Sequence, residues 1–367
     1  MKIVVISYHT FNSRRKAGFH FIAKELSSLG HEVFFITAGL SLLSKIKGDQ
    51  RYKSAKTYRA DLGFISHKES GVNFYSPIEV LHPVGIRVQF IEDIVNYLLV
   101  RKAPPAAVRA EILTADMIVV ESCVGLVWLD FISENNDLEG KKIIYRVSDD
   151  LTFMGVNRLL TRSEYNLIKK DVFDIVSCPV DVIARKFDCL SDKVIVQQHG
   201  LDNYFYDIPW DNPYSSLSNR KNAVFVGISR FDSEVCNVLI ENFPEVNFHF
   251  IGECVGIKGA PNSTVYGVLS FEETIKYIVH ADIGLQTIRV SETDMFKYSL
   301  KVLQYSYAGL PIFGPECLDT KWGNFYGYKD RTVVEICRTF RSALGRSRDL
   351  SARHHVSTWK SLVQRWL

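Results

Sequence analysis

The segment 299–311 has the residue types and spacing of an anion-binding helix. Ser299 at its start can cap the first turn and leave other backbone N–H groups free. Lys301 and Gln304 are three residues apart, so they share one face of the helix. Free N–H groups beside a lysine bind anions, and diphosphate is the anion that we expect here. The same pattern also suits an amphipathic helix with a surface lysine, so these residues alone leave both interpretations open.

A pair of aspartates, Asp149 and Asp150, follows the apolar run 143–147. A carboxylate at the carboxyl end of a strand can take the proton from an attacking hydroxyl group. Repulsion from Asp150 would raise the pKa of Asp149, which suits a general base. Ser148-Asp149-Asp150 is also a typical start for a following helix, and from the residues alone we favour this capping role.

A third candidate, Gly227-Ile228-Ser229-Arg230, follows the apolar run 222–227. Gly227 would let the backbone approach a phosphate or a base closely. Arg230 can hold diphosphate oxygens through two parallel hydrogen bonds. A simple turn with a surface arginine is the alternative.

These candidates lie in two consecutive series of strand-like runs that alternate with helical patterns. The first series predicts strands at 2–7, 32–38, 116–121, 142–147, 174–178 and 193–198, with helices such as 19–30 and 87–100. The second predicts strands at 222–227, 246–252, 264–267, 282–286 and 312–314, with helices such as 270–279 and 299–308.

The polar, turn-rich segment Pro209–Arg220 separates the two series, and we interpret it as an interdomain linker. The prediction is an α/β fold with two doubly wound, Rossmann-like domains at residues 1–204 and 205–345. Open sheets of this kind bind ligands at the carboxyl ends of their strands.

Charge is uneven along the chain. Residues 1–60 hold 11 Lys or Arg and 3 acidic residues, a net charge of +8, whereas the whole chain is only +3. An anionic membrane surface fits this segment, since leucines and Ile46 are interleaved with Lys45, Lys47, Arg51 and Lys53. A solvated basic loop is an equal alternative. No nucleic-acid-binding motif appears, so we expect no nucleic-acid partner.

Composition excludes several other classes. With 367 residues, 47% hydrophobic and 23% charged, the chain is typical of a two-domain globular protein. Its 7 cysteines are scattered without a CxxC pair, which argues against a zinc site or a disulfide framework and for a reducing compartment. No signal peptide and no run of about 18 apolar residues is recognisable.

Several segments resemble glycosyltransferase family 70, the membrane-associated β-glucuronosyltransferases of xanthan synthesis, and they occur in the same order over most of the chain. They are Arg14-Arg15 with His20-Phe21-Ile22, Lys47-Gly48-Asp49-Gln50-Arg51, Glu121-Ser122, Tyr145-Arg146-Val147-Ser148-Asp149, His199-Gly200-Leu201-Asp202, and Ser299-Leu300-Lys301-Val302-Leu303-Gln304-Tyr305. The resemblance implies the GT-B fold, in which two Rossmann-like domains face each other across a cleft and a terminal helix, here 346–367, crosses back to the first domain. Trp359, Leu362 and Trp366 would line one face of that helix.

The resemblance also implies roles for the candidate residues. The aspartate that matches Asp149 is the family's general base, so we now favour that role over capping. The start of the helix at Ser299 and Leu300, with Lys301 and Arg230, would hold the donor diphosphate, and Gln304 the ribose. No metal and no cofactor is expected, since the lysine and the helix start offset the leaving diphosphate charge.

Two positions depart from the family pattern. Ser229 stands where the family has a methionine in contact with the nucleotide, and Val268 where it has an acid near the uracil or ribose. These departures bear on the donor sugar rather than on the fold. On the acceptor side the resemblance points to Arg14, Arg15, His20 and Glu121, with surface ion pairing as the alternative for the arginines.

We therefore expect an inverting glycosyltransferase that moves glucuronate from UDP-glucuronate to a polyprenyl-diphosphate-linked oligosaccharide in exopolysaccharide synthesis. It would act peripherally at the cytoplasmic face of the inner membrane. Two alternatives remain: a GT-B transferase with another donor, such as UDP-glucose or a GDP-sugar, and a catalytically inactive nucleotide- or carbohydrate-binding module. A retained Asp149 argues against the inactive module.

Overall fold

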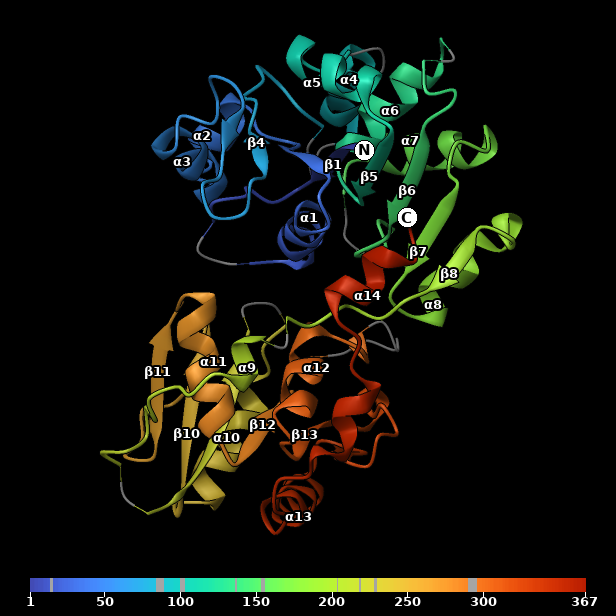
Figure 1. Cartoon of the computed structure of the whole chain (residues 1–367). Coiled ribbons are helices and arrows are strands. Elements are labelled where there is room, and N and C mark those ends of the chain that lie inside the picture. Colours follow the sequence, from blue (N-terminus) through green and yellow to red (C-terminus); the bar gives the residue numbers. More distant parts are fainter. Residues whose placement is uncertain are drawn as a thin grey trace. The chain divides into compact units, whose positions relative to one another are not determined.

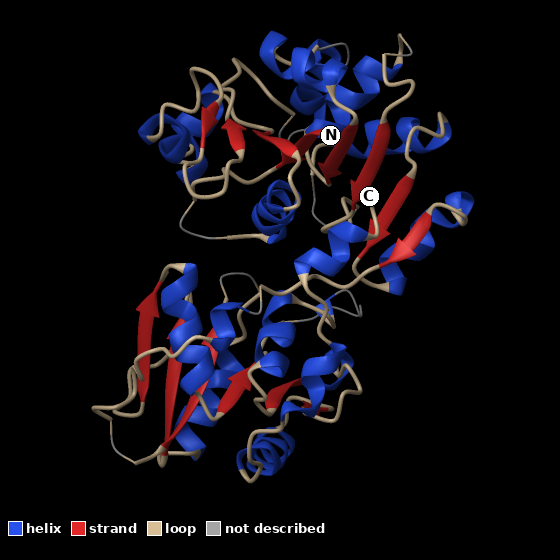
Figure 2. Cartoon of the chain, in the orientation of Figure 1, coloured by secondary structure: helices blue, strands red, loops and turns tan. Residues whose placement is uncertain are grey.

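The computed structural model describes residues 1–13, 16–83, 89–99, 103–135, 137–152, 156–202, 204–217, 219–227, 230–289 and 296–367. Arg14, Arg15 and Ser229 of the predicted site lie outside these residues. The chain divides into two compact units, Met1–Gln197 with Val363–Leu367, and Gln198–Leu362. Each unit is built on one sheet with helices packed against it (Figures 1 and 2). No helix among the described residues is long and apolar enough to cross a membrane.

The sheet of the N-terminal unit has the strand order β3-β4-β2-β1-β5-β6-β7-β8. Its neighbours pair in parallel, except that β3 runs antiparallel to β4. Parallel strands covered on both faces are continuous apolar runs, and every residue of β5 is buried. The strands are β1 Lys2–Ser7, β2 Glu32–Thr37, β3 Ile65–Ser66, β4 Asn73–Tyr75, β5 Met117–Glu121, β6 Lys142–Arg146, β7 Ile175–Cys178 and β8 Val194–Val196.

The helices of this unit connect the strands in two directions. They are α1 Gly18–Ser28, α2 Leu42–Ile46, α3 Gln50–Thr57, α4 Gln89–Leu99, α5 Ala106–Thr114, α6 Gly125–Ser133, α7 Arg158–Lys169, α8 Asp181–Ala184 and a 3₁₀ helix Arg185–Leu190. From β1 the chain adds β2 and β4 on one side of the sheet, and it then adds β5, β6, β7 and β8 on the other side of β1. The direction in which strands are added therefore reverses between β1 and β5 (Figure 1). Such a switch point opens a crevice at the carboxyl ends of the strands, where ligands bind.

The sheet of the C-terminal unit is parallel throughout, in the order β11-β10-β9-β12-β13-β14, so its switch point lies between β9 and β12. Its strands are β9 Lys221–Val226, β10 Val246–Ile251, β11 Ser263–Gly267, β12 Ile283–Leu285, β13 Ile312–Pro315 and β14 Phe325–Tyr328. Its helices are α9 Tyr204–Asp207, α10 Ser233–Asn242, α11 Phe271–His280, α12 Leu300–Tyr307 and α13 Val333–Leu344, with 3₁₀ helices Glu316–Leu318 and Leu350–His355. The last helix, α14 Trp359–Gln364, begins in this unit and ends in the N-terminal unit, which includes Val363–Leu367.

Close packing fixes α12 on this sheet. The buried Tyr305 ring lies where a side chain on Gly284 would be, because a Cβ atom there would come within 2.5 Å of the ring. The Tyr305 hydroxyl accepts a hydrogen bond from the backbone N–H of Val226 at 3.1 Å. It donates one to the carbonyl oxygen of Val224 at 3.3 Å. The start of α12 is therefore held at a defined place beside β9 and β12.

Two predictions about the connections need correction. The segment Pro209–Arg220 lies inside the C-terminal unit rather than between the units. Its Tyr214 is buried, and the hydroxyl donates to the carbonyl of Tyr277 at 2.9 Å. An aromatic residue packed in this way makes the segment part of a core, not a flexible linker.

The terminal helix predicted at 346–367 is interrupted. After the 3₁₀ helix the chain is extended at Val356, and the carbonyl of Ser357 accepts the backbone N–H of Leu201 at 2.8 Å. The α-helix begins only at Trp359, after Thr358, whose side chain accepts the N–H of Ser361 at 3.1 Å. Pairing of Thr358 with Leu201 therefore replaces helical hydrogen bonds at this point.

Candidate active site

The N-terminal unit has a pocket of about 530 Å³ at the carboxyl edge of its sheet, at the switch point. Its lining comes from the residues that follow β1, β2, β5 and β6, together with α2, α3 and the start of α7. The polar residues of the lining are Tyr8, His9, Ser44, Lys47, Asp49, Arg51, His82, Glu121, Ser122, Ser148, Asp149 and Asn157. The structure thus brings together Asp149, Glu121, Lys47 and Arg51, which the sequence could only nominate separately.

Asp149 lies three residues after the end of β6, is exposed, and lines this pocket. Asp149 does not cap α7, the first helix after it among the described residues. This helix begins at Arg158, and its cap is Asn157, whose side chain accepts the N–H of Leu159 at 2.8 Å. A carboxylate that is exposed in a pocket can meet a substrate hydroxyl group.

Asp150, in contrast, points into the protein and is buried. Its carboxylate pairs with Lys186 and accepts the N–H of Thr152 at 2.8 Å. Burial raises the pKa of Asp150, but the hydrogen bonds from Lys186 and Thr152 outweigh it and bring that pKa below its ordinary value. The Lys186 ammonium offsets the Asp150 charge, so the repulsion expected to act on Asp149 loses its main source.

Glu121, at the end of β5, is a buried carboxylate in the wall of the pocket. Its Oε2 accepts the hydroxyl of Ser7 at 2.5 Å and the N–H of Tyr8 at 2.9 Å, and Oε1 lies 3.9 Å from His9 Nε2. Glu121 therefore ties the end of β1 to the end of β5 and still presents an oxygen to the pocket.

Arg51 has a different role from the one predicted for it. Its guanidinium donates to the carbonyls of Tyr8 at 2.8 Å and Gly39 at 3.2 Å, pairs with Asp49 at 2.7 Å, and lies 3.6 Å above the Tyr8 ring. Burial raises the pKa of Asp49, but the hydrogen bonds and charge of Arg51 outweigh it and lower that pKa. Arg51 joins the loops after β1 and β2 to α3, so it shapes the pocket and is not a free charge for a membrane.

His20 is also placed differently from the prediction. It is buried in α1, where Nδ1 accepts the N–H of Ala17 at 2.9 Å and Nε2 lies 2.9 Å from the carbonyl of Thr10. Burial is the main cause that lowers the pKa of His20 to about 3, with smaller contributions from His9 and Lys16. The side chain is therefore a neutral structural cap without access to an acceptor.

The basic, leucine-bearing segment is only partly a surface. Lys45, Lys47 and Lys53 are exposed, as are Leu42 and Ile46 on α2. Leu40, however, is buried in the core. The part of this segment that faces solvent is thus α2 with Lys45 and Lys47 at its end, and Lys53 on α3. Lys47 also lines the pocket.

In the C-terminal unit the predicted donor residues gather at the start of α12. Ser299 caps the helix, and its hydroxyl also accepts an N–H from the side chain of Gln286, which follows β12, at 3.1 Å. Lys301 Nζ donates to Oε1 of Gln304 at 2.7 Å. Gln304 is fully buried, and within the described part of the chain its Nε2 has no hydrogen-bond partner. Leu300 is the first residue of α12.

The other donor candidates lie at the same edge of this sheet. Gly227 follows β9 and packs against Phe225, whose ring would be 3.1 Å from a Cβ atom at that position. Arg230 has a backbone φ of +58° and a guanidinium 4.8 Å from the centre of the Phe296 ring. Val268 follows β11 and is exposed.

Several pocket residues were missed from the sequence, among them Tyr8, His82 and Asn157. Tyr8 directly follows β1, and that position was a usable signal, since residues at strand ends line the switch point. His82 lies in a loop without periodicity, and its Nδ1 contacts the hydroxyl of Ser41 at 2.8 Å. No local pattern indicates such a contact.

Residues 5–179 match the family model described as the N-terminal domain of the glucuronosyltransferase GumK. Over 353 residues the chain is 28% identical to the UDP-glucuronate:glycolipid 2-beta-glucuronosyltransferase of Xanthomonas campestris pv. campestris, covering 93% of this chain and 83% of that protein.

Solved structures agree on the fold. The sucrose-phosphate synthase of Thermosynechococcus elongatus superposes with a TM-score of 0.68 at 10% identity, over 100% of this chain and 97% of that one. An E. coli trehalose-6-phosphate protein bound with UDP-2-fluoro glucose gives 0.58 at 11% identity, over 100% and 96%. The architecture is GT-B, residues 5–179 are similar to the N-terminal domain of GumK, and the chain is a GumK-like glycosyltransferase.

Proposed function

We propose that this glycosyltransferase moves glucuronate from UDP-glucuronate to a lipid-linked oligosaccharide, with inversion at the anomeric carbon, in exopolysaccharide synthesis. The observation that carries the proposal is the exposed Asp149 carboxylate in the pocket of the GumK-type domain. The Xanthomonas relative, as its name says, acts on UDP-glucuronate and a glycolipid.

Asp149 acts as the general base. It takes the proton of the acceptor hydroxyl as that oxygen bonds to the anomeric carbon of the donor. The bond between this carbon and the UDP oxygen breaks in the same step, and UDP leaves with the electron pair. Inversion follows because the attack comes from the face opposite to UDP.

The start of α12 supports the leaving UDP. Lys301 and the first N–H groups of the helix place positive charge where the diphosphate develops negative charge, and Arg230 adds a guanidinium at the same edge. The Gln304 amide, whose Nε2 has no hydrogen-bond partner among the residues that the structure describes, supplies a donor for a ribose oxygen. This proposal needs no metal and no cofactor, and turnover in excess EDTA tests that part of it.

The acceptor sugar occupies the pocket of the N-terminal unit. Glu121 and Asn157 offer hydrogen-bonding groups there, and Lys47 adds a cation at the rim. We place the enzyme peripherally at the cytoplasmic face of the inner membrane, where a polyprenyl-diphosphate-linked acceptor is presented to a UDP-sugar. The Xanthomonas relative's name specifies a glycolipid acceptor, which supports this placement.

Lys45 and Lys53 would contribute to that attachment by charge, since each lysine near an anionic surface adds about 1 kcal/mol. We expect Lys45→Gln/Lys53→Gln to weaken binding to anionic vesicles roughly thirtyfold, with less effect at high salt. Lys321→Gln/Lys329→Gln, two exposed lysines of the C-terminal unit, is the matched control. Equal losses of vesicle binding in both double variants would show that Lys45 and Lys53 have no special role in membrane attachment.

The identity of the donor is tested by thermal unfolding with UDP-glucuronate, UDP-glucose and a GDP-sugar at equal concentrations. UDP-glucuronate should raise the Tm most. A larger shift with UDP-glucose would favour the second candidate donor, which the exposed Val268 supports because an acid stands there in the resembled family. No shift with any nucleotide-sugar would leave the proposal without a donor.

A further inference from the structure

Helix α4 of the N-terminal unit presents its apolar residues to solvent. Phe90 is 73% exposed, Ile94 47%, Tyr97 81% and Leu98 66%, whereas the acidic Glu92 on the same helix is only 8% exposed. A helix on the surface of a globular protein ordinarily has the opposite arrangement. Four bulky apolar side chains that gather on one exposed helix indicate an interaction surface.

Contacts of α4 with α7 keep the helix in this orientation. The buried Glu92 carboxylate accepts the backbone N–H of Arg158, the first residue of α7, at 3.2 Å. Leu99 at the other end of α4 is buried in the core. Turning Phe90 and Tyr97 inward would therefore expose Leu99 and break the contact of Glu92.

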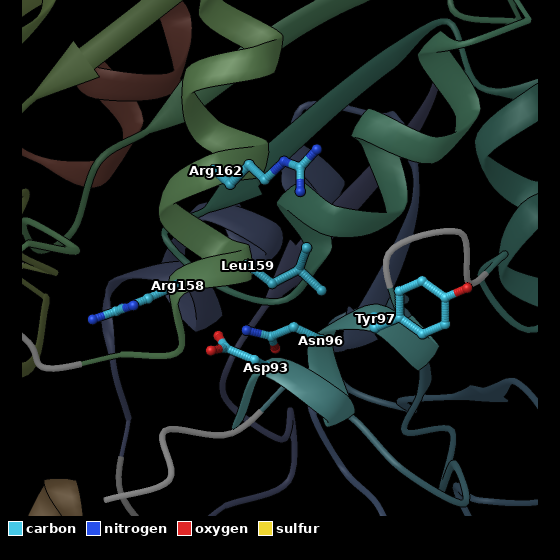
Figure 3. Close-up of a pocket in the computed structure, with 6 residues that line it drawn as sticks. All are labelled: Asp93, Asn96, Tyr97, Arg158, Leu159 and Arg162. Atoms are coloured by element: carbon cyan, nitrogen blue, oxygen red, sulfur yellow. The ribbon is translucent and has the colours of Figure 1, made fainter. Parts of the chain in front are cut away.

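A pocket of about 300 Å³ lies between the two helices and carries positive charge. Figure 3 shows Arg158 and Arg162 of α7 on either side of Leu159, with Tyr97, Asn96 and Asp93 of α4 below them. Both arginines are exposed, and among the described residues neither guanidinium has a hydrogen bond or an ion pair. The residues that line this pocket thus include two arginines and one carboxylate, Asp93.

We propose that α4 and the first turns of α7 form the membrane-docking surface of this enzyme, and that its occupant is an anionic lipid bilayer. The apolar residues of α4 enter the boundary between headgroups and acyl chains, where aromatic and aliphatic side chains are stable. Arg158 and Arg162 bind lipid phosphates beside them, since guanidinium groups hold phosphate oxygens in pairs. Charge complementarity therefore favours a bilayer over an uncharged apolar partner.

The surface is continuous in sequence with the candidate acceptor pocket. Asn157 and Leu160 line the pocket that contains Asp149, while Arg158 and Leu159, between them, line the pocket of Figure 3. An acceptor anchored in the bilayer by its lipid would reach the catalytic pocket at the same helix start. This part of the inference rests on the proposed function; the docking itself does not.

Co-sedimentation of the full chain with vesicles tests the apolar contribution. Phe90→Gln/Tyr97→Gln should reduce binding to vesicles with 30 mol% phosphatidylglycerol roughly a hundredfold, because each buried aromatic contributes about a factor of ten or more. Val334→Gln on α13, which removes an exposed apolar residue from a helix of the other unit, should have no effect. Unchanged binding of the double variant would overturn the proposal, as would an altered oligomeric state in solution, which would identify the face as a protein interface.

The charged contribution is tested with Arg158→Gln/Arg162→Gln. Its binding should fall on anionic vesicles and not on neutral ones, and the dependence on salt should become weaker. Lys169→Gln, an exposed cation in the last turn of α7, is the control and should bind as the wild type does. Equal effects of the control would overturn the assignment to these arginines.

Binding of UDP, followed by thermal unfolding, separates this inference from the proposed function. The α4 variant should retain the UDP shift, and it should still transfer sugar to a short, detergent-soluble acceptor. Lost docking with retained transfer supports the inference. Normal docking by a wild-type protein that transfers no sugar would contradict the proposed function alone.

Discussion

The two units hold their candidate site residues in different ways. In the N-terminal unit two polar side chains of the pocket, besides their side-chain partners, are bound to the backbone: Glu121 to Tyr8, and Arg51 to Tyr8 and Gly39. In the C-terminal unit the donor residues bind each other through side chains, Lys301 to Gln304 and Gln286 to Ser299. Backbone contacts survive when a substrate enters, whereas contacts between side chains compete with it.

The difference indicates a preformed acceptor site and a donor site that must exchange partners. For Gln304 to meet a ribose and Lys301 a diphosphate, the hydrogen bond between them has to open or be shared. Substitutions in the N-terminal unit should therefore change the placement of the acceptor and the stability of the fold. Substitutions at α12 should change the binding of UDP.

The largest effect is expected for Asp149→Asn. Without a base, turnover should fall roughly 10²–10⁴-fold, while the fold and the thermal shift with UDP remain. Ser148→Ala, at the neighbouring pocket position, is the control and should lose far less. Near-normal turnover in the Asp149 variant would remove the carboxylate from the mechanism.

Lys301→Ala should act on donor affinity and rate together, because the charge matters most as UDP leaves. We expect turnover to fall by about 10²–10³ and the affinity for UDP to weaken. Titration calorimetry with UDP and steady-state rates measure the two quantities. If both match those of Lys329→Ala, an exposed lysine elsewhere in the same unit, Lys301 is a surface residue only.

Arg51→Gln should loosen the acceptor pocket without changing the donor site. Loss of its charged hydrogen bonds should lower the free energy of unfolding by about 1–3 kcal/mol and raise the KM for the acceptor, with the affinity for UDP unchanged. Urea unfolding and kinetics provide both readouts. Lys53→Gln, an exposed position on the same helix, should stay within about 0.5 kcal/mol of the wild type.

Buried histidines should make the stability of both units decrease in acid. This effect should be smaller than the effects of the substitutions above. Burial lowers the pKa of His20 to about 3 and that of His249 to about 4. Unfolded histidine binds a proton near pH 6.5, so the unfolded state takes up more protons below that pH. The stabilisation is complete above pH 6.5 and is lost as the pH falls towards 4.

The Tm measured from pH 7 to pH 4.5 should therefore decline, and less steeply in His20→Gln and in His249→Gln. His354, which is exposed, provides the control, and His354→Gln should leave the slope unchanged. A decline that is identical in all three variants would assign the acid sensitivity to carboxylates instead.

The fold was accessible from the sequence because its strands are continuous apolar runs. The runs at β1 and β5 predicted strands, and the two series of runs that alternate with helical patterns predicted two units. Asp149 and the start of α12 could be nominated because each follows or precedes such a run. The periodicity of a sequence does not show which groups a long polar side chain contacts in the folded protein.

Arg51 illustrates this limit. It was placed with Lys45 and Lys53 in a basic surface, but Asp49, two residues earlier, and the carbonyls of two distant loops draw it inward. The buried, structural role of His20 could not be predicted for a related reason. Its hydrogen-bond partners, Thr10 and Ala17, come close to the ring only when α1 packs against the sheet. Such contacts depend on tertiary structure and leave no local pattern.

The central claim is that the enzyme transfers glucuronate with the Asp149 carboxylate of the N-terminal pocket as general base. Labelled donors test this claim most directly. Wild-type protein and Asp149→Asn are incubated with a lipid-linked oligosaccharide acceptor and either UDP-[¹⁴C]glucuronate or UDP-[¹⁴C]glucose, and label in the lipid extract is counted. We predict label from UDP-glucuronate with the wild type and almost none with the variant. Label from UDP-glucose alone, or equal label with both proteins, would contradict the account.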